Sequence, residues 1–385
     1  MQVGTVYRVI AIACAAVWFA LVLFTTPKFL NDNLLFILVS ALTVGLMVLA
    51  RLFLGMNLIN SVVQTLQIII MALVGLVSIY FHKYDKDFMK ILVPIVLLSI
   101  IVFCITTTYG VITDPYSARI ANSEWLEERF EGNEMVGLYG YVYMCVFIAP
   151  MLLYLMQKKV DLGKITNWLV RLTFIAILVM VACAGYMIAI FCTACGCVFI
   201  WTFSQKSVIK KVVVVFALIL FLISYETIID LIFSFLMDLT KDNPVYYTKF
   251  YDFRSLFLSG DVSGDTVGGR FSNYAASFKN IVEYPFLGCY FFGKSGFGGG
   301  HSAILDIFGR FGLGTAIAYL YMLLGFPHRM SGKGRRWNAL DYTVLIISVV
   351  FGILDPFFQE MSIALFFVFP FVISAEREQS LSLKA

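Results

Sequence analysis

The chain has 385 residues, of which 61% are hydrophobic and only 14% are charged, and its mean hydropathy is +0.89. This composition excludes a set of soluble domains, because apolar runs of about 20 residues, the length of a membrane-crossing helix, recur along the chain. It also excludes a nucleic-acid-binding domain and an outer-membrane barrel, whose strands would alternate apolar and polar residues. The 28 Lys and Arg exceed the 24 Asp and Glu only slightly, so the placement of charge is more informative than its total.

Apolar runs, separated by charged or Gly-, Asn- and Pro-rich breaks, predict an all-α polytopic membrane protein. The predicted spans are 9–26, 34–53, 61–81, 90–108, 137–157, 167–184, 187–203, 211–236, 311–326, 341–354 and 361–376. The stretch 167–203 is too long for one ordinary span, and the small residues Ala184 and Gly185 predict a tight turn within it. We therefore expect about eleven spans, between ten and twelve, in one transmembrane domain covering 1–385.

Positive charge predicts which loops face the cytoplasm. Four short connections are rich in Lys and Arg, namely 83–90, 158–164, 206–211 and 329–336. The loops 109–135 and 237–310 then face outward, and the second is the longest hydrophilic segment of the chain. Eleven spans place the N-terminus outside, although Arg8 weakly favours the opposite orientation. Because polar residues concentrate in the two large loops, we expect the function to lie at the outer face.

The second outer loop contains a predicted short helix. The helix is indicated by four side chains at helical spacing, Arg270, Tyr274, Phe278 and Ile281. It is expected to begin near Gly269 and to end before Pro285. A Gly-rich stretch, 295–300, then leads to His301 at the start of a further helix. Helix starts approached through glycines favour anions such as phosphate, so this loop is the first candidate for a site.

Three other patterns have simpler interpretations. Residues 288–295 match the phosphate-loop pattern G-x4-G-K-[ST], but such a loop follows a buried strand and opens a helix, whereas three aromatic residues occupy this one. Lys294 remains a cation able to bind phosphate. The acidic pair in 85–87 is interpreted as a solvated loop, and the cysteines in 192–197 as packing residues without a His partner. No metal site is predicted.

Two segments resemble the O-antigen ligase and polymerase superfamily of membrane transferases. The residues His301, Ser302, Gly312 and Thr315 match its H-[NSQ]-x9-G-x2-[GTY] signature. The residues Arg270, Tyr274, Pro285 and Gly288 are similar to its R-x3-W…P-x2-G segment, with Tyr in place of the usual Trp. Residues 116–121, which include Arg119, resemble an Arg-containing segment of its earlier outer loop, and 369–371 resemble its usual ending.

This resemblance implies a GT-C-like helical fold and glycosyl transfer at the periplasmic face of the bacterial cytoplasmic (inner) membrane. The donor would be an oligosaccharide linked to undecaprenyl diphosphate, and the partners would be the lipid bilayer and a chain-length regulator. No nucleic acid, metal or cofactor is implied. Arg270 would stabilise the departing diphosphate, with Arg119, Arg254 and Lys294 in support, because guanidinium groups pair with phosphate oxygens. His301 would accept the proton of the attacking hydroxyl.

Three functions remain open at this point. The first is a Wzy-type polymerase, which transfers a growing glycan onto a fresh lipid-linked repeat unit. The second is a ligase that transfers the finished glycan to lipid A core or another terminal acceptor, and it shares the same motif. The third is a lipid or polysaccharide transporter, which predicts polar residues inside the spans. Glu226 and Asp230 lie one turn apart, but near the outward end of 211–236, where an interfacial helix is the simpler interpretation.

Overall fold

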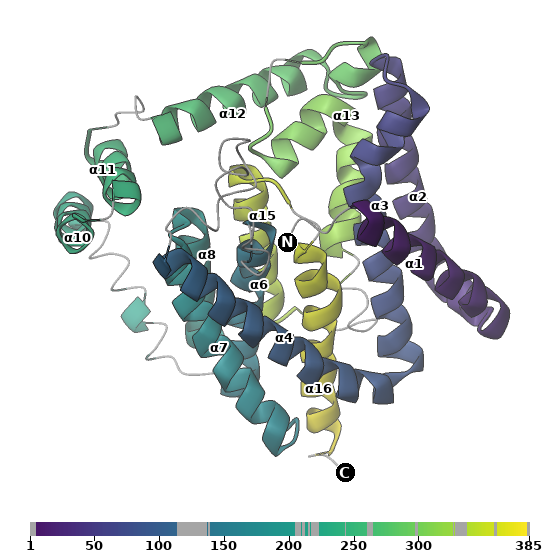
Figure 1. The fold of residues 1–385 in the computed structure, drawn as a ribbon, viewed down its shortest axis with the longest axis horizontal. Coiled ribbons are helices and arrows are strands. Elements are labelled where there is room, and N and C mark those ends of the chain that lie inside the picture. The colour runs from purple at the N-terminus through teal and green to yellow at the C-terminus, as the bar shows by residue number, and fades with distance from the viewer. Residues whose placement is uncertain are drawn as a thin grey trace.

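A computed structural model describes most of the chain. The described residues are 5–113, 137, 139–204, 209, 212–214, 216, 223–242, 244–259, 265–296, 299–325, 327, 337–357 and 360–382. Within them the chain is helical and contains no strand (Figure 1). Arg119 and most of the loop 109–135 lie outside the described residues.

The helices follow one another in chain order with short connections. The first seven are α1 (Thr5–Thr25), α2 (Lys28–Phe53), α3 (Leu58–Tyr84), α4 (Lys86–Thr113), α6 (Tyr139–Lys158), α7 (Lys164–Ala184) and α8 (Met187–Phe203). The next three are α10 (Tyr225–Leu239), α11 (Pro244–Ser259) and α12 (Asp265–Glu283). They are followed by the 3-10 turn η2 (Cys289–Phe292), α13 (Ala303–Leu320), the π-helical turn η3 (Tyr321–Gly325), α15 (Ala339–Leu354), the π-helical turn η4 (Ile363–Val368) and α16 (Phe369–Ser382).

Among the described residues, six helices are long and apolar enough to cross a membrane. They are Asn31–Phe53, Leu58–Tyr84, Phe88–Thr113, Tyr139–Lys158, Lys164–Ala184 and Ala303–Gly325. Shorter apolar helices cover Ala13–Thr25, Met187–Phe203 and Ala339–Leu354. The protein is therefore a helical membrane protein, and the total of eleven spans stays a prediction. The expected turn between two spans is confirmed at Gly185, whose φ of 64° is left-handed and follows the end of α7.

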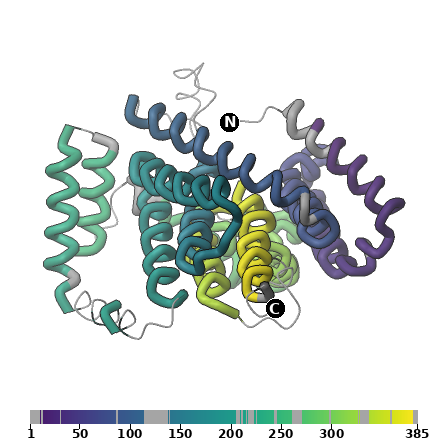
Figure 2. Tube along the Cα trace, turned by 90° about the horizontal axis from the view of Figure 1, so that it is seen from below, coloured from purple at the N-terminus to yellow at the C-terminus, as the bar shows by residue number. Residues whose placement is uncertain are grey.

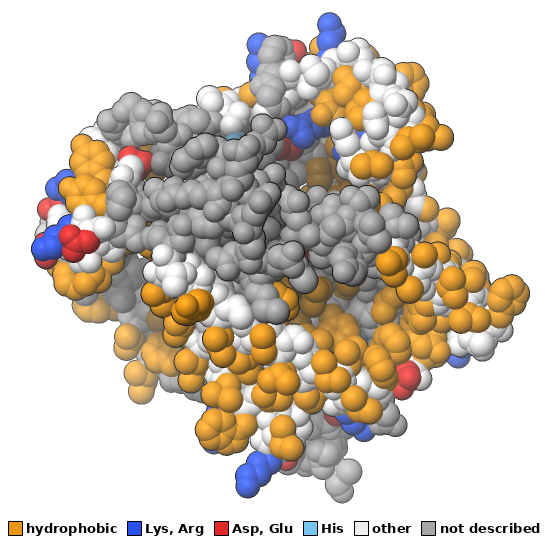
Figure 3. Space-filling view, viewed as in Figure 1, with side chains coloured by type: hydrophobic (Ala, Val, Ile, Leu, Met, Phe, Trp, Pro, Cys, Tyr) orange, Lys and Arg blue, Asp and Glu red, His pale blue; other side chains and the backbone are white. Residues whose placement is uncertain are grey.

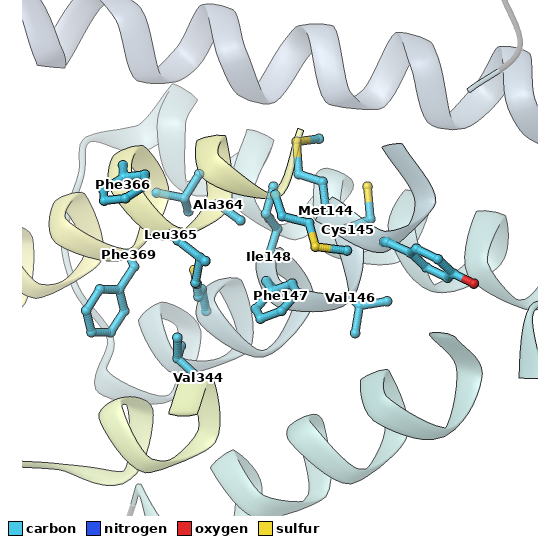
Figure 4. Packing of buried hydrophobic residues seen from close by; sticks show 14 of the residues in the cluster. Met144, Cys145, Val146, Phe147, Ile148, Val344, Ala364, Leu365, Phe366 and Phe369 are labelled. Atoms are coloured by element: carbon cyan, nitrogen blue, oxygen red, sulfur yellow. The ribbon is translucent and has the colours of Figure 1, made fainter. Parts of the chain in front are cut away.

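The core of the bundle is built around α6. Its residues 144–148 are at most 4% exposed, and Figure 4 shows them packed against Val344 of α15, residues 364–366 of η4 and Phe369 at the start of α16. Because α6 is apolar on all sides, it is surrounded by other helices. The outer helices differ, since they bury only one stripe and leave large apolar side chains exposed.

Exposed apolar side chains cover much of the bundle. Examples from five different helices are Phe24, Ile59, Ile91, Ile175 and Ile346. Figure 3 shows hydrophobic side chains over much of the lower part of the visible face, with charged side chains near the top, over α10 and α11 at the left, and at the bottom edge. Such extensive apolar surface is unfavourable in water and matches the hydrocarbon of a bilayer.

The helices α10 and α11 form a hairpin that stands apart from the bundle (Figure 2). The ring of Phe233 in α10 packs against those of Phe250, Phe253 and Phe257 in α11. The predicted span 211–236 therefore does not continue to its expected end, because a new helix starts after Ser224 and pairs with α11 instead. The polar residues in α10 account for this difference, since one face of the helix is unsuited to the bilayer interior.

The helices α12 and α13 carry the predicted motif segments. As Figure 1 shows, α12 crosses one end of the bundle, which we call the site end. The helix ends at Glu283, before Pro285, as predicted, and it begins four residues earlier than expected, at Asp265. The start of the next helix after His301 is also confirmed, because α13 begins at Ala303 with Ser302 as its N-cap.

A kink at Gly312 divides α13. The φ of 78° at Gly312 interrupts the helical backbone and frees the Leu313 N–H, which donates to the Pro285 carbonyl oxygen at 3.0 Å. A Cβ at Gly312 would overlap the Phe286 carbonyl, and a Cβ at Gly288 would overlap the backbone of Arg310. Both glycines therefore allow the 285–288 segment to pack directly on the backbone of α13. The two motif segments meet at this contact.

We expect Gly312→Ala to destabilise the protein by about 1–3 kcal/mol, because alanine is strained at positive φ and its Cβ would push against backbone. Gly314→Ala is the matched control, since that helical glycine has open space around it and a substitution should be neutral or slightly stabilising. The measurement is the apparent Tm of each purified variant in detergent. Equal Tm values for both variants would show that the kink does not require glycine.

Candidate functional site

The site end brings Arg270 of α12 to Asp355, which follows α15. An Arg270 Nη1 donates to Asp355 Oδ2 at 3.3 Å, and the Tyr143 hydroxyl donates to the same oxygen at 3.0 Å. The Asp355 side chain is 6% exposed, whereas that of Arg270 is 32% exposed. The carboxylate is therefore buried behind the guanidinium, and it fixes the direction in which Arg270 points.

Burial raises the pKa of the Asp355 carboxyl above its ordinary value, and the positive charge of Arg270 and the hydrogen bond from Tyr143 only partly oppose this. Burial by itself lowers the pKa of Arg270, but the charge and hydrogen bond of Asp355 together with Tyr143 and Tyr274 more than compensate, so the pKa of Arg270 lies above its ordinary value. Arg270 is thus a fixed cation, and it has unused hydrogen-bond donors on a partly exposed guanidinium.

Tyr274 lies one turn after Arg270 on α12 and attaches that helix to α15. Its hydroxyl donates to the Leu354 carbonyl oxygen at 2.6 Å. A tryptophan at this position, the usual residue of the resembled family, has a ring N–H that can only donate, so both residues can serve the same carbonyl. The interaction places the α12 backbone beside the residue that precedes Asp355.

His301 lies directly before Ser302, the N-cap of α13. The backbone N–H of Ala303 donates to the Asp355 carbonyl oxygen at 3.1 Å, and the Ser302 hydroxyl donates to the Gly352 carbonyl oxygen at 3.1 Å. Ser302 also caps α13 by accepting from the Leu305 N–H at 3.1 Å. The His301 side chain is exposed. Arg270 therefore bonds the Asp355 carboxylate from α12, while the segment directly after His301 bonds the backbone at the end of α15.

Asp306 fixes the position of the loop that precedes His301. Its carboxylate accepts from the Gly300 backbone N–H at 2.6 Å and from the Ser277 hydroxyl on α12. A Cβ at Gly299 would meet the Asp306 and Ser277 side chains, so the glycine allows the loop to lie directly against them. The side chain of Asp306 is buried and joins three segments, α12, α13 and the residues before His301.

We expect Asp306→Ala to displace His301 and to slow by about 10–100-fold any reaction in which the His301 side chain takes part, since small displacements of a reacting group are costly. The same substitution leaves the Gly300 N–H and the Ser277 hydroxyl without their acceptor, which destabilises the protein by about 1–3 kcal/mol. Asp306→Asn keeps one acceptor oxygen and should retain more of both properties. Turnover and apparent Tm are measured together, and unchanged turnover in Asp306→Ala would contradict the positioning role.

A cavity of about 270 Å³ opens beside Arg270. Its described lining contains the aromatic residues Tyr139, Tyr143, Tyr186, Phe253, Phe271 and Tyr274. We call it the tyrosine-lined cavity. Its described polar lining includes Arg270, Lys249 and Asp252, and Lys249 Nζ donates to the Gly185 carbonyl oxygen at 3.2 Å. A mostly aromatic cavity with a few charged groups is typical of a binding site for an amphipathic ligand.

The remaining predicted residues are placed elsewhere. Arg254 forms an ion pair with Asp230 across the α10–α11 hairpin, at 2.5 Å, and is not among the described residues that line the cavity. Lys294 is exposed beyond η2, outside that lining as well. Thr315 is 2% exposed within α13. Arg119 lies outside the described residues, so its role stays a prediction.

The phosphate-loop pattern has a different fold, as expected from its sequence. Residues 289–292 form the turn η2, which follows α12 and not a strand, and no helix begins at Lys294. Within the part of the chain that the structure describes, no three His, Cys, Asp or Glu side chains are grouped closely enough to hold a metal ion. The described part of the site end thus presents cations and aromatic rings.

A larger cavity, about 500 Å³, lies at the opposite end of the bundle. It is enclosed by the end of α3, the start of α4, the loop before α7, and α16, and its lining includes His82, Lys90, Asp161 and Glu378. The Lys-rich connections 83–90 and 158–164 are at this end, where the charge pattern predicts the cytoplasm. We place the candidate site at the smaller cavity, because Arg270 and Tyr274 of the motif segments line it.

Sequence reasoning missed Asp355, Tyr143 and Lys249. Asp355 was detectable, because it is an isolated carboxylate directly after an apolar run and before Pro356, and buried charges near membrane segments require a partner. Tyr143 and Lys249 gave no such signal, since a tyrosine in an apolar span and a lysine in an outer helix are both common.

Comparison of the chain with protein-family models, with curated proteins and with solved structures gives no match. The function is therefore argued from the residues at the site end and from the motif spacing.

Proposed function

We propose that the protein is a polysaccharide polymerase of the Wzy type, which acts at the outer face of the bacterial cytoplasmic membrane. The observation that supports it is that Arg270 and the segment carrying His301 are both bonded to Asp355, beside the tyrosine-lined cavity. The lipid-linked donor carries a diphosphate, an apolar chain and sugars. A fixed guanidinium can bind the diphosphate. Aromatic walls can pack against the sugar faces and the start of the lipid chain.

The proposed reaction is a displacement at the anomeric carbon of the donor. The oxygen of an acceptor hydroxyl forms a bond to that carbon, and the bond from the carbon to the diphosphate oxygen breaks, with its electron pair leaving on the diphosphate. His301 accepts the hydroxyl proton, and Arg270 stabilises the charge that develops on the leaving oxygen. Asp355 touches no reacting atom in this scheme, and it positions Arg270. The reaction needs neither nucleotide nor metal.

The test is an in vitro assay with purified protein in liposomes. The substrate is the undecaprenyl-diphosphate-linked repeat unit, extracted from cells of the native host that lack this gene, in the presence of chelator and without nucleotide sugars. The expected product is a ladder of regularly spaced glycans on a gel. Transfer only after lipid A core is added would replace the polymerase with a ligase. No transfer in either mixture, from protein shown to be folded, would refute glycosyl transfer.

A further inference from the structure

A second pair of arginines lies at the site end, away from the tyrosine-lined cavity. Arg51 is near the end of α2, inside a predicted span. Its guanidinium donates to the Thr65 hydroxyl at 2.9 Å and to the Met47 carbonyl oxygen at 3.3 Å, and its Cζ lies 4.9 Å from the centre of the Phe311 ring. Further donors reach the side chain and carbonyl of Gln64. All of these partners are neutral, so the charge of Arg51 is held in place without being neutralised.

Arg310 precedes Phe311 on α13 and carries the second charge. Its Nε is shielded from solvent and has no hydrogen-bond partner, and its guanidinium forms no ion pair within the described part of the chain. Arg51 lies against Phe311, the residue after Arg310, so the two arginines are neighbours where α2 contacts α13. Two neighbouring cations in a predicted membrane bundle, without a carboxylate paired to either among the described residues, are unfavourable unless an anion joins them.

The surroundings of the two arginines are fixed. The Tyr290 ring of η2 packs edge-on against Phe311, with 5.3 Å between ring centres, and Phe53 of α2 packs against Phe291. The contact of Gly288 with the Arg310 backbone joins the same turn to α13. The pair is thus preorganised, which lowers the cost of ordering it around a ligand. Apolar rings also weaken the screening of charge and strengthen the attraction for an anion.

The location relative to Arg270 suggests what this anion is. The part of α12 from Arg270 to Glu283 is roughly 20 Å long at about 1.5 Å per residue. At its far end the chain continues through 285–288 to η2, which contacts α2. The arginine pair and Arg270 therefore lie towards opposite ends of α12, the helix that crosses the site end (Figure 1). A short oligosaccharide bridges a separation of this size.

We propose that Arg51 and Arg310 bind the diphosphate of the acceptor lipid, while Arg270 binds that of the donor. This inference rests on the proposed polymerase function, in which both substrates are lipid diphosphates. The acceptor reacts through a hydroxyl at the end of its repeat unit that is distant from its own diphosphate. Two separate anion sites, one towards each end of α12, meet this requirement.

The experiment uses substrates that can react in only one role. The donor carries a blocked terminal sugar, so it cannot accept, and the acceptor is joined to its diphosphate lipid through a carbon–phosphorus bond, so it cannot be transferred. Arg310→Gln should raise the KM for this acceptor at least tenfold and leave the KM for the donor within about twofold of wild type. Arg310→Lys should be intermediate, because lysine keeps the charge but not the paired donors. Arg377→Gln, the same change at the opposite end of the bundle, is the control.

Further arms separate this inference from the proposed function. A free repeat unit without lipid or diphosphate should be used equally by wild type and Arg310→Gln, because it has no anion for the pair. Excess phosphatidylglycerol vesicles should not compete, and competition would assign the pair to ordinary lipid headgroups. An unchanged acceptor KM in Arg310→Gln, from a protein that polymerises, overturns the acceptor site alone. If no transfer occurs with any substrate, native mass spectrometry can measure how many undecaprenyl diphosphate molecules bind to each protein. Equal numbers for wild type and Arg310→Gln would then overturn the acceptor site independently of the proposed function.

Discussion

His301→Ala is expected to lower glycosyl transfer by about 10²–10⁴-fold, the usual contribution of a positioned proton acceptor. The side chain is exposed, and the structure shows no hydrogen bond from it to a described residue. Its removal should therefore leave folding and membrane insertion intact. In a cell this appears as loss of polymer with a normal amount of protein in the membrane. In vitro it appears as loss of the ladder at unchanged apparent Tm.

Added imidazole distinguishes the chemical role of His301 from a structural one. If the ring accepts a proton, dissolved imidazole should restore part of the activity of His301→Ala, because the small base can occupy the vacated position. Lys279→Ala is a suitable companion variant, since Lys279 is a cation on α12 that is 55% exposed and paired only loosely with Glu283, at 3.9 Å. Full activity of His301→Ala without imidazole would remove the reason for placing the chemistry at the start of α13.

The helices that follow from local pattern were predictable. The paired spans α7 and α8, the turn at Gly185, and the helices on both sides of 285–302 were all expected from periodicity and breakers. The end of the predicted span 211–236 was not predictable in this way. A run of apolar residues does not show where a helix leaves the bilayer and pairs with another helix. The partners of α10 are supplied by α11, and no property of α10 alone identifies them.

The site was predictable only in part. Motif spacing located Arg270, Tyr274 and His301, and the structure connects them through Asp355 and Leu354. Asp355 is 85 residues from Arg270 in sequence, so their pairing depends on how α12 crosses the end of α15. For Arg254, the sequence suggested a role in the site that its position in the structure does not favour. Its charge made it a candidate for binding phosphate, but a carboxylate on the adjacent helix already neutralises it.

The pair Arg270–Asp355 should give asymmetric effects on stability. Arg270→Gln leaves a buried carboxylate with the Tyr143 hydroxyl but without its guanidinium, which we expect to cost about 1–3 kcal/mol. Asp355→Asn removes the buried charge and leaves Arg270 partly exposed to solvent, so its effect on stability should be close to zero or slightly favourable. The double variant should recover most of the stability that Arg270→Gln loses, as measured by apparent Tm.

Activity should follow a different order. Arg270→Gln removes the group that we propose stabilises the leaving diphosphate, and we expect about 10²–10³-fold slower transfer. Asp355→Asn keeps that group but no longer fixes its direction, so its loss should be smaller. The double variant should be as slow as Arg270→Gln in spite of its recovered stability. Equal activity of Arg270→Gln and wild type would show that the diphosphate leaves from another site.

The pH dependence of stability tests the buried carboxylate directly. The pKa of Asp355 in the folded protein is raised above its unfolded value, so the folded state binds more protons and stability falls as pH rises through the interval between the two values. Below the unfolded pKa, wild type and Asp355→Asn should be equally stable, and the advantage of the variant should grow between the unfolded and the raised pKa and be complete above the raised pKa. In Arg270→Gln the folded pKa of Asp355 rises further, because the opposing positive charge is gone. Its loss of stability should therefore be larger and extend to higher pH, which thermal unfolding of the variants from about pH 4 to about pH 8 can measure. A pH-independent difference between Arg270→Gln and wild type would mean that Arg270 supports the fold through packing and not through the charge of Asp355.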